Sequence, residues 1–193
     1  MNQGELNKIV DAHAEWLASQ GVRGVRADLS GADLSGADLR RTDLTDADLS
    51  GADLTDANLR RTDLSGANLS GANLRRADMR SAYLQGANLS GAHLQDADLT
   101  DAKLQSAKLQ SANLRGARLW GVDLSEADLS GANLSRANLA DANLVGSNLS
   151  GAIFVDVDLM CADLRKANLQ GVDLRDADLF GADLTDVVGY TPQ

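Results

Sequence analysis

Residues 27–46 read ADLSGADLSGADLRRTDLTD, and the same unit, A-(D/N)-L-x-x, continues without insertion or deletion to Asp186. The chain holds 32 consecutive units, and Leu occupies every central position except two, which are Met79 and Phe154. Ala stands two residues before the centre, with six exceptions: Thr42, Thr62, Val122, Ser147, Val157 and Val172. A period of five matches neither an α-helix nor a β-strand, so the pattern indicates a repeat architecture.

This unit resembles the pentapeptide-repeat family, whose members form a right-handed quadrilateral β-helix with four units per coil. The resemblance covers residues 27–186 and implies an all-β solenoid of about eight coils. On that fold the central Leu and the preceding Ala point inward, and each face returns every 20 residues. Burying each Leu contributes roughly 1.5–3 kcal/mol. The motif specifies the core and leaves the outward positions free, so it indicates the fold more strongly than the function.

The sequence divides into three segments: 1–26, an N-terminal capping helix and lead-in; 27–186, the β-helix; and 187–193, a C-terminal tail. We expect an amphipathic helix over residues 5–20, stopped by Gly21, because apolar residues recur there at helical spacing. These residues are Leu6, Ile9, Val10, His13, Trp16 and Leu17. The helix should cover the open first coil, and a partner-docking helix is the alternative. In the tail, Pro192 cannot continue a ladder, so the tail folds over the last coil or a second subunit covers that end.

The composition is acidic, with a net charge of −10, an isoelectric point near 4.5 and one cysteine, Cys161. A single cysteine forms no internal disulfide. The N-terminus lacks the basic start and apolar run of a signal peptide, and no apolar stretch has the length of a membrane span. We therefore expect a soluble cytoplasmic protein without membrane association.

One outward column changes character along the chain. It begins with a basic strip, formed by Arg40, Arg41, Arg60, Arg61 and Arg80. We expect these side chains to pair with neighbouring carboxylates such as Asp38 and Asp43, and an anion site is the alternative.

The same column ends apolar, at Trp120, Met160 and Phe180, with Cys161 beside Met160. Ile153 and Val155 on the adjoining face are expected to enlarge this patch. Contiguous apolar surface marks a contact site, so we expect a self-association or partner interface here, including a homodimer through the C-terminal half. The alternative is neutral variation of exposed positions.

The most acidic face carries Asp43, Asp63, Asp123, Asp163 and Asp183, helped by Asp46, Glu126 and Asp186. The family resemblance implies an alternative function, because some members inhibit DNA gyrase or protect it from quinolones as mimics of duplex DNA. Duplex DNA carries about one charge per 1.7 Å, more than twice the density that a net −10 gives this rod. Residues 75–118 also carry four acidic and seven basic residues, a net +3 that interrupts the imitation.

Catalytic chemistry has little support in the sequence. His13 and His93 are the only histidines, and neither they nor Cys161 form a recognisable catalytic set, metal-ligand spacing or cofactor motif. We therefore expect no catalytic, metal or cofactor site and no direct contact with nucleic acid. The preferred hypothesis is a rigid scaffold that presents ordered side chains to an unidentified protein partner.

Overall fold

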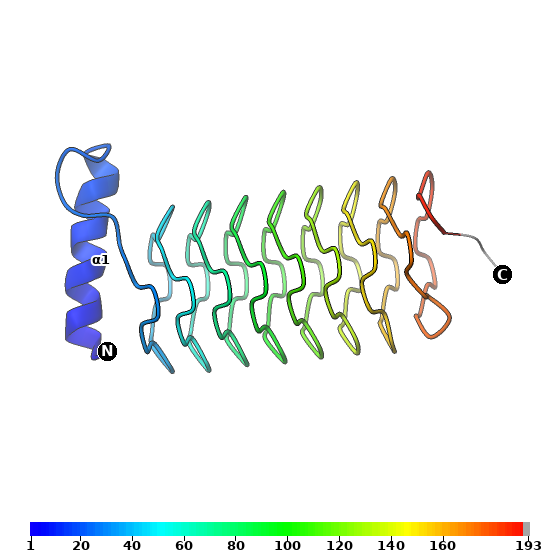
Figure 1. Ribbon diagram of the computed structural model, residues 1–193, viewed down its shortest axis with the longest axis horizontal. Coiled ribbons are helices and arrows are strands. Elements are labelled where there is room, and N and C mark those ends of the chain that lie inside the picture. The colour runs from blue at the N-terminus through cyan, green and yellow to red at the C-terminus, as the bar shows by residue number, and fades with distance from the viewer. Residues whose placement is uncertain (191–193) are drawn as a thin grey trace.

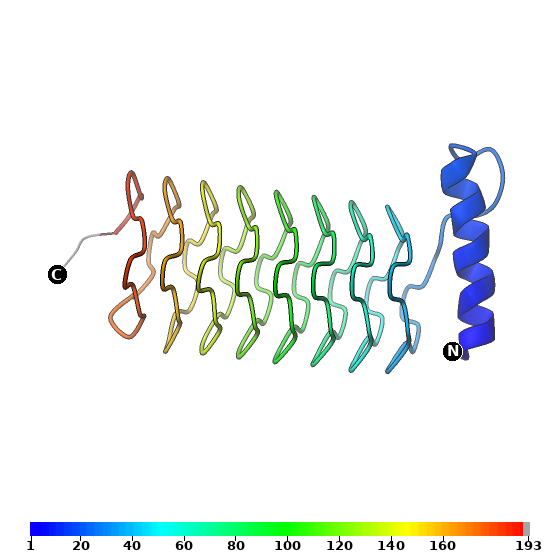
Figure 2. The same ribbon diagram turned by 180° about the vertical axis from the view of Figure 1, so that it is seen from behind.

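The protein is a rod with one helix at its N-terminal end. Its structure is a computed structural model that describes residues 1–190. Helix α1 spans Gln3–Ala18 and stands across the first coil of a solenoid whose ladder begins at Asp28 (Figures 1 and 2). The last described residues, drawn in red, lie at the opposite end of the rod (Figure 1). Among the described residues, none of the helical structure is long and apolar enough to cross a bilayer.

The solenoid is built from isolated parallel β-bridges that join residues 20 apart, such as Asp28 to Asp48 and Asp48 to Asn68. Four five-residue units therefore make one coil. Within this ladder the Leu29 N–H donates to the Asp48 carbonyl at 2.7 Å, and the Asp48 N–H donates to the Ala27 carbonyl at 3.0 Å. The β-solenoid expectation is confirmed, whereas right-handed winding and eight coils stay predictions.

Each unit ends in a tight turn whose residues explain the repeat. The Ala32 N–H donates to the Leu29 carbonyl at 3.1 Å, and Gly31 between them has φ +61°. A positive φ at the third turn residue is typical of a type II turn and favours glycine there. The Asp28 Oδ1 accepts from the N–H of Ser30 at 3.1 Å. Short Asp and Asn side chains cap their own backbone in this way, which explains their frequency in the unit.

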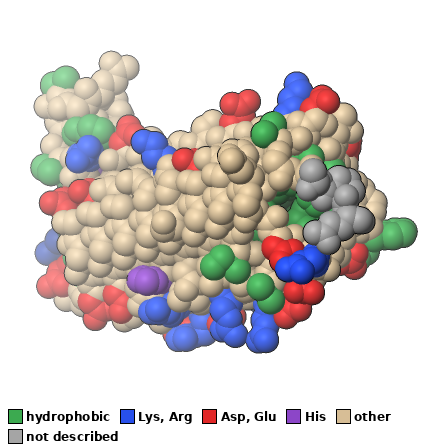
Figure 3. Space-filling view, turned by 45° about the vertical axis from the view of Figure 1, so that its right-hand side comes forward, with side chains coloured by type: hydrophobic (Ala, Val, Ile, Leu, Met, Phe, Trp, Pro, Cys, Tyr) green, Lys and Arg blue, Asp and Glu red, His purple; other side chains and the backbone are tan. Residues whose placement is uncertain are grey.

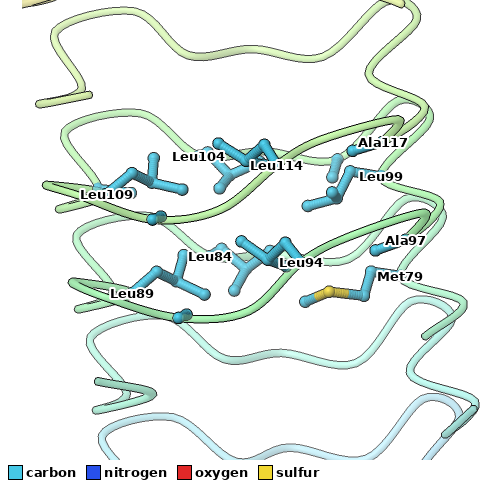
Figure 4. Packing of buried hydrophobic residues seen from close by; sticks show 14 of the residues in the cluster. Met79, Leu84, Leu89, Leu94, Ala97, Leu99, Leu104, Leu109, Leu114 and Ala117 are labelled. Atoms are coloured by element: carbon cyan, nitrogen blue, oxygen red, sulfur yellow. The ribbon is translucent and has the colours of Figure 1, made fainter. Parts of the chain in front are cut away.

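The core is a stack of inward Leu and Ala side chains along the rod. In consecutive coils Leu84 lies under Leu104, and Met79 lies under Leu99 (Figure 4). These central side chains are at most 1% exposed. Ala97 has the same relation to Ala117, and the small residue leaves room for the neighbouring walls (Figure 4). Both predicted inward positions are confirmed over most of the rod.

Helix α1 begins and ends two residues earlier than we expected. Asn2 caps it, because the Asn2 Oδ1 accepts from the Glu5 N–H at 2.9 Å and the Glu5 carboxylate accepts from the Asn2 N–H at 3.1 Å. This capping box fixes the start. At the other end the Gly21 N–H bonds the Trp16 carbonyl and the left-handed residue is Gln20, with φ +55°. The stop is thus a Schellman-type turn in which Gly21 follows the left-handed residue.

The helix packs its apolar stripe on the first coil, which fits a cap. Leu6 is 2% exposed and joins the core, with Ile9 and Val10 half-buried beside it. His13 is fully buried, and its Nδ1 accepts from the Ala27 N–H at 3.0 Å. Trp16 stacks on the His13 ring, with ring centres 5.5 Å apart. Leu17, the last residue of the predicted stripe, is half-buried.

At the C-terminal end the ladder runs past the predicted boundary of the repeat. Val188 bridges to Asn168, and its carbonyl accepts from the Leu169 N–H at 2.7 Å. Tyr190 is half-buried against the core. The repeat pairing therefore extends two residues beyond Asp186. The rest of the predicted tail, including Pro192, lies outside the described residues.

One segment of the last coil leaves the ladder. The parallel bridge expected between Ile153 and Asp173 is missing among residues 1–190, as are the ladder bonds from the Phe154 and Asp156 N–H groups. The chain forms a visible loop here, orange in Figure 1. Phe154 is the single Phe at a central position and is 2% exposed. We attribute the break to its extra volume, because overpacking shifts backbone.

Candidate interaction surfaces

The turns place two outward residues of every unit at a corner of the rod. One corner, which we call the mixed corner, lies between the faces of Asp38 and Asp43. Bridges from Asp38 through Asn58, Asp78 and onward to Asp178 keep its residues in register. It consists of Arg40, Arg41, Arg60, Arg61, Arg80, Ser81, Thr100, Asp101, Trp120, Gly121, Ala140, Asp141, Met160, Cys161, Phe180 and Gly181. The structure thus brings the predicted basic strip and three of the predicted apolar residues onto one edge.

In the basic half of the mixed corner, only part of the predicted charge pairing forms. The Arg40 guanidinium bonds both Asp38 carboxylate oxygens, at 2.8 and 2.6 Å, and this lowers the pKa of Asp38. Arg80 grips Asp78 in the same way, at 2.8 and 2.6 Å. Asp43, the other expected partner, instead accepts from Thr45. This half of the corner therefore holds both paired and unpaired guanidinium groups.

The unpaired groups belong to Arg41, Arg60 and Arg61. None of them has a carboxylate oxygen within 4.0 Å in the part of the chain that is described. Together with Arg40 and Asp38 they line an open hollow of about 560 Å³ on the surface of the first coils. The sequence placed these arginines together but gave no signal for which of them would lack a partner.

The apolar half of the mixed corner is exposed. Phe180 is 76% exposed, Trp120 47% and Met160 39%. The Trp120 Nε1 donates to the Asp141 carboxylate at 2.9 Å, which holds the indole along the corner. Cys161, a free exposed thiol, lies next to Met160. These side chains form an apolar edge toward the C-terminal end of the rod.

Ile153 and Val155 lie elsewhere. Ile153 bridges to Asn133 on another face, and Val155 occupies the turn that leads from that face to the one carrying Asp158. Both are close to half exposed. The face of Asp158 separates them from the mixed corner, so they form a second apolar spot next to the break at Phe154.

The C-terminal end itself also exposes core residues. Leu179 and Leu184 occupy central positions of the last units and are only half-buried, as is Ala182. Figure 3 shows hydrophobic side chains at this end of the rod. Within residues 1–190 no helix covers them as α1 covers the first coil. The apolar half of the mixed corner and the end of the core therefore lie at the same end of the molecule.

The residues of the predicted acidic face do lie in one column, but their carboxylates accept hydrogen bonds from neighbouring side chains. Bridges connect Asp43 to Asp63 and Asp163 to Asp183, with Tyr83, Lys103 and Asn143 interrupting the series around Asp123. Asp123 accepts from Gln105 Nε2 at 2.6 Å, and Arg165 bonds both oxygens of Asp163. That hydrogen bonding lowers the pKa of Asp163. The face is thus a mixed polar ladder.

Groups with catalytic chemistry are not brought together. His13 is buried where helix α1 packs on the first coil, His93 is exposed on the face of Asn73, and Cys161 lies on the mixed corner. No cluster of three His, Cys, Asp or Glu side chains suited to a metal ion occurs among residues 1–190. The outward surface is instead one of ordered turns, ion pairs and the apolar edge.

Comparison with known proteins identifies the repeat. The family model described as pentapeptide repeats matches in eight copies, over residues 25–61, 57–96, 82–121, 121–156 and 158–187. HetL, a pentapeptide repeat protein involved in heterocyst differentiation regulation in the cyanobacterium Nostoc sp. strain PCC 7120, is 34% identical. The match covers 97% of this chain and 92% of HetL, with a TM-score of 0.36.

Two further solved structures are similar. A pentapeptide repeat protein from the thylakoid lumen of Arabidopsis thaliana is 36% identical over 61% of this chain and 72% of its own, with a TM-score of 0.38. QnrB1, a plasmid-mediated fluoroquinolone resistance protein, is 22% identical over 85% of this chain and 87% of its own, with a TM-score of 0.56. A comparison with curated protein sequences gave no match. The chain belongs to the pentapeptide-repeat family.

Proposed function

We propose that this protein is a non-enzymatic, rigid interaction scaffold that forms a homodimer through its C-terminal half. The observation that carries the proposal is the exposure of Phe180, an aromatic side chain that is 76% accessible at the end of an otherwise well-packed rod. Trp120 and Met160 extend the apolar surface along the same corner. Exposed apolar patches of this kind mark protein contact sites.

The incomplete burial of leucines in the last coil supports a second copy of this chain as the partner that packs on this end. Leu179 and Leu184 remain half-buried within the described chain, although the same positions of the first coils are fully buried. A second subunit that packs on the C-terminal half would bury these leucines together with Phe180. Removing one Leu side chain from water stabilises by roughly 1.5–3 kcal/mol.

Rigidity supports the scaffold role. The ladder and the Leu stack run with little interruption from Leu29 to Leu169, so outward side chains keep fixed spacings along the rod. Each coil is held by its neighbours, as in other solenoids that present extended binding surfaces. The scattered positions of His13, His93 and Cys161 favour a binding role over catalysis. A different protein partner would use the same apolar edge.

Sedimentation velocity of the full chain over a range of concentrations tests the dimer. We expect the wild type to dimerise, Phe180→Asp to sediment as a monomer, and Trp120→Ala to dimerise more weakly than the wild type. The matched control is Val22→Asp, which places the same charge on a residue that is 83% exposed at the other end of the rod. Monomers for every variant, including the wild type, would overturn the dimer.

The alternative function is modulation of a type II topoisomerase by DNA mimicry. It is motivated by the net charge of −10 and by the acidic column around Asp123 and Asp163. We give it second place because Arg165 pairs with Asp163 and because the mixed corner carries unpaired arginines. A DNA-like surface would need far denser free charge, about one per 1.7 Å.

A DNA gyrase supercoiling assay with quinolone protection scored in the same titration separates the two functions. The scaffold proposal predicts no effect even at high micromolar protein. Inhibition or protection at low micromolar concentration, lost in Asp123→Asn/Asp163→Asn, would establish the alternative. Arg165→Gln is the informative control, because it frees the Asp163 carboxylate and should strengthen a true mimic.

A further inference from the structure

The open hollow on the mixed corner concentrates positive charge in the first coils. It is lined by Arg40, Arg41, Arg60, Arg61 and Asp38 and has a volume of about 560 Å³. Four guanidinium groups face one carboxylate, and all four arginines are exposed. We call this feature the basic hollow.

The ladder fixes the arrangement of these arginines. The Arg41 N–H donates to the Arg60 carbonyl at 3.0 Å, so the pair 40–41 sits directly beside the pair 60–61 of the next coil. Adjacent coils lie about 4.8 Å apart, the spacing of paired β-strands. Arg41 and Arg61 occupy the left-handed turn position, with φ +59° and +57°. The result is a two-by-two array whose backbone is held by the fold.

Most neighbouring carboxylates are bound by other arginines, although Asp78 also interacts electrostatically with Arg60. Asp38 is engaged by both donors of Arg40. Asp56, on an adjoining turn, is held by Arg76 through bonds of 2.8 and 2.6 Å, and Asp78 is held by Arg80. Among the described residues Arg41, Arg60 and Arg61 have no ion pair, so the basic hollow keeps a net positive charge of about three, and its like charges repel one another.

Guanidinium groups in this number and spacing suit a phosphate-rich ligand. Arg presents a planar fork of N–H donors that binds phosphate oxygens in pairs, and such charge-assisted bonds are stronger than neutral ones. Three free forks exceed what one phosphate group requires, and the hollow is large enough for more. We propose that the basic hollow binds a small ligand that carries a diphosphate group.

The basic hollow is separate from the proposed C-terminal contact. The basic hollow lies in the first coils, and the apolar half of the mixed corner lies in the last ones. Binding should also stabilise the fold, because a ligand that binds only the native state raises its stability and relieves repulsion among the arginines. The site is exposed, so its affinity should fall as salt screens the charges.

Isothermal titration of the full chain with inorganic pyrophosphate tests the site, and ADP and inorganic phosphate serve as comparison ligands. We expect pyrophosphate to bind the wild type once per chain and more tightly than phosphate. In Arg60→Gln/Arg61→Gln its affinity should fall at least tenfold. Gln is acceptable at position 61 because Gln20 already adopts the same backbone conformation in this chain. Tighter binding of ADP than of pyrophosphate would support the site and assign the diphosphate to a nucleotide.

The matched control is Arg115→Gln/Lys166→Gln. It removes two exposed positive charges from the corresponding turn positions of later coils, outside the hollow. Its affinity for pyrophosphate should stay within twofold of the wild type. Arg60→Lys/Arg61→Lys keeps the charge and removes the fork, and it should bind more weakly than the wild type. Equal binding by the wild type and Arg60→Gln/Arg61→Gln, or no binding by the wild type at millimolar pyrophosphate, would overturn the proposal.

Discussion

The two ends of the rod are made from the same repeat but finish differently. At the N-terminal end, α1 covers the first coil, and Leu29 and Leu34 are at most 2% exposed. At the C-terminal end, Leu179 and Leu184 occupy equivalent positions and stay half-buried within residues 1–190. The comparison teaches that the five-residue unit builds a core but does not close it. An end that is covered by a helix presents no open coil to other molecules, whereas an end that is left uncovered can serve as a contact site.

The position of the ladder break at residues 173–177 also depends on how many neighbouring coils support a coil. Val122 is a large residue at an Ala position in the middle of the rod, yet its coil stays regular and Val122 is fully buried. Phe154 lies in the coil before the last one, and residues 173–177 of the last coil leave the ladder. Within residues 1–190 the last coil has a neighbouring coil on one side only, and we attribute the break to the volume of Phe154. A coil with two neighbours resists the strain of a large residue, whereas the terminal coil yields to it.

The largest effect should come from uncoupling the cap. Leu6→Ala removes the one helix side chain that joins the core and should lower the free energy of unfolding by about 2–5 kcal/mol. Urea unfolding measures this, and hydrogen exchange should show faster exchange along α1. Val22→Ala, at an exposed position of the same segment, should change little. If both variants unfold alike, α1 does not stabilise the first coil.

Acid should loosen the N-terminal end through His13. Burial lowers the pKa of His13 below its ordinary value of 6.5, and its Nδ1 must stay unprotonated to accept from the Ala27 N–H. The Thr45 backbone, Asp43 and Asp46 favour protonation, each with a smaller effect than burial, and Arg26 opposes protonation with the smallest effect. A lowered folded pKa means that the stabilising contribution is present above pH 6.5 and is lost as the pH falls through the folded pKa.

Urea midpoints and α1 hydrogen exchange across this range measure the effect of His13. Carboxylates lose their charge only near pH 4 and below, about two pH units under the ordinary pKa of histidine. The effect of His13 on stability can therefore be separated from that of the carboxylates. The Gln side chain of His13→Gln does not titrate, so this variant should lose the pH dependence of the urea midpoint above about pH 5. We set this lower bound about one pH unit above the ordinary carboxylate pKa. His93→Gln, at an exposed histidine, should retain it. A wild type that is equally stable from pH 7 to about 5 would refute the role of His13.

A smaller effect should come from repairing the last coil. Phe154→Leu restores the residue of the repeat and should let residues 173–177 rejoin the ladder, with each recovered bond adding about 0.5–1.5 kcal/mol. Hydrogen exchange at the amides of positions 154 and 156 should slow. Met79→Leu, the same repair in a coil that is already regular, should leave exchange unchanged. Fast exchange at position 154 in Phe154→Leu would show that another residue causes the break.

The uninterrupted five-residue unit predicted a repeat architecture with inward Leu and Ala positions, and its resemblance to the pentapeptide-repeat family implied the β-solenoid and the 20-residue register. It also predicted the pairing of Arg40 with Asp38, which are two residues apart on one turn. The earlier start of α1 follows from the Asn2–Glu5 capping box, a local signal that the sequence contains.

Other features depend on contacts that the repeat does not encode. The bond from Ala27 to His13 joins the helix to the solenoid and appears only once the helix is docked. Whether Arg60 and Arg61 form ion pairs depends on which arginine each nearby carboxylate binds. In this structure Asp38 binds Arg40 and Asp56 binds Arg76. The loose segment at residues 173–177 depends on its place in the terminal coil. Phe154 was visible in the sequence, but its consequence was not.

The reactivity of Cys161 most directly tests whether the C-terminal half is the contact end. This single thiol is exposed on the mixed corner between Met160 and the Phe180 turn, so a second subunit would shield it. The rate of maleimide labelling should fall as wild-type protein is concentrated from submicromolar to high micromolar, and it should stay constant for Phe180→Asp. A wild-type rate that is the same at every concentration would contradict a dimer through this half.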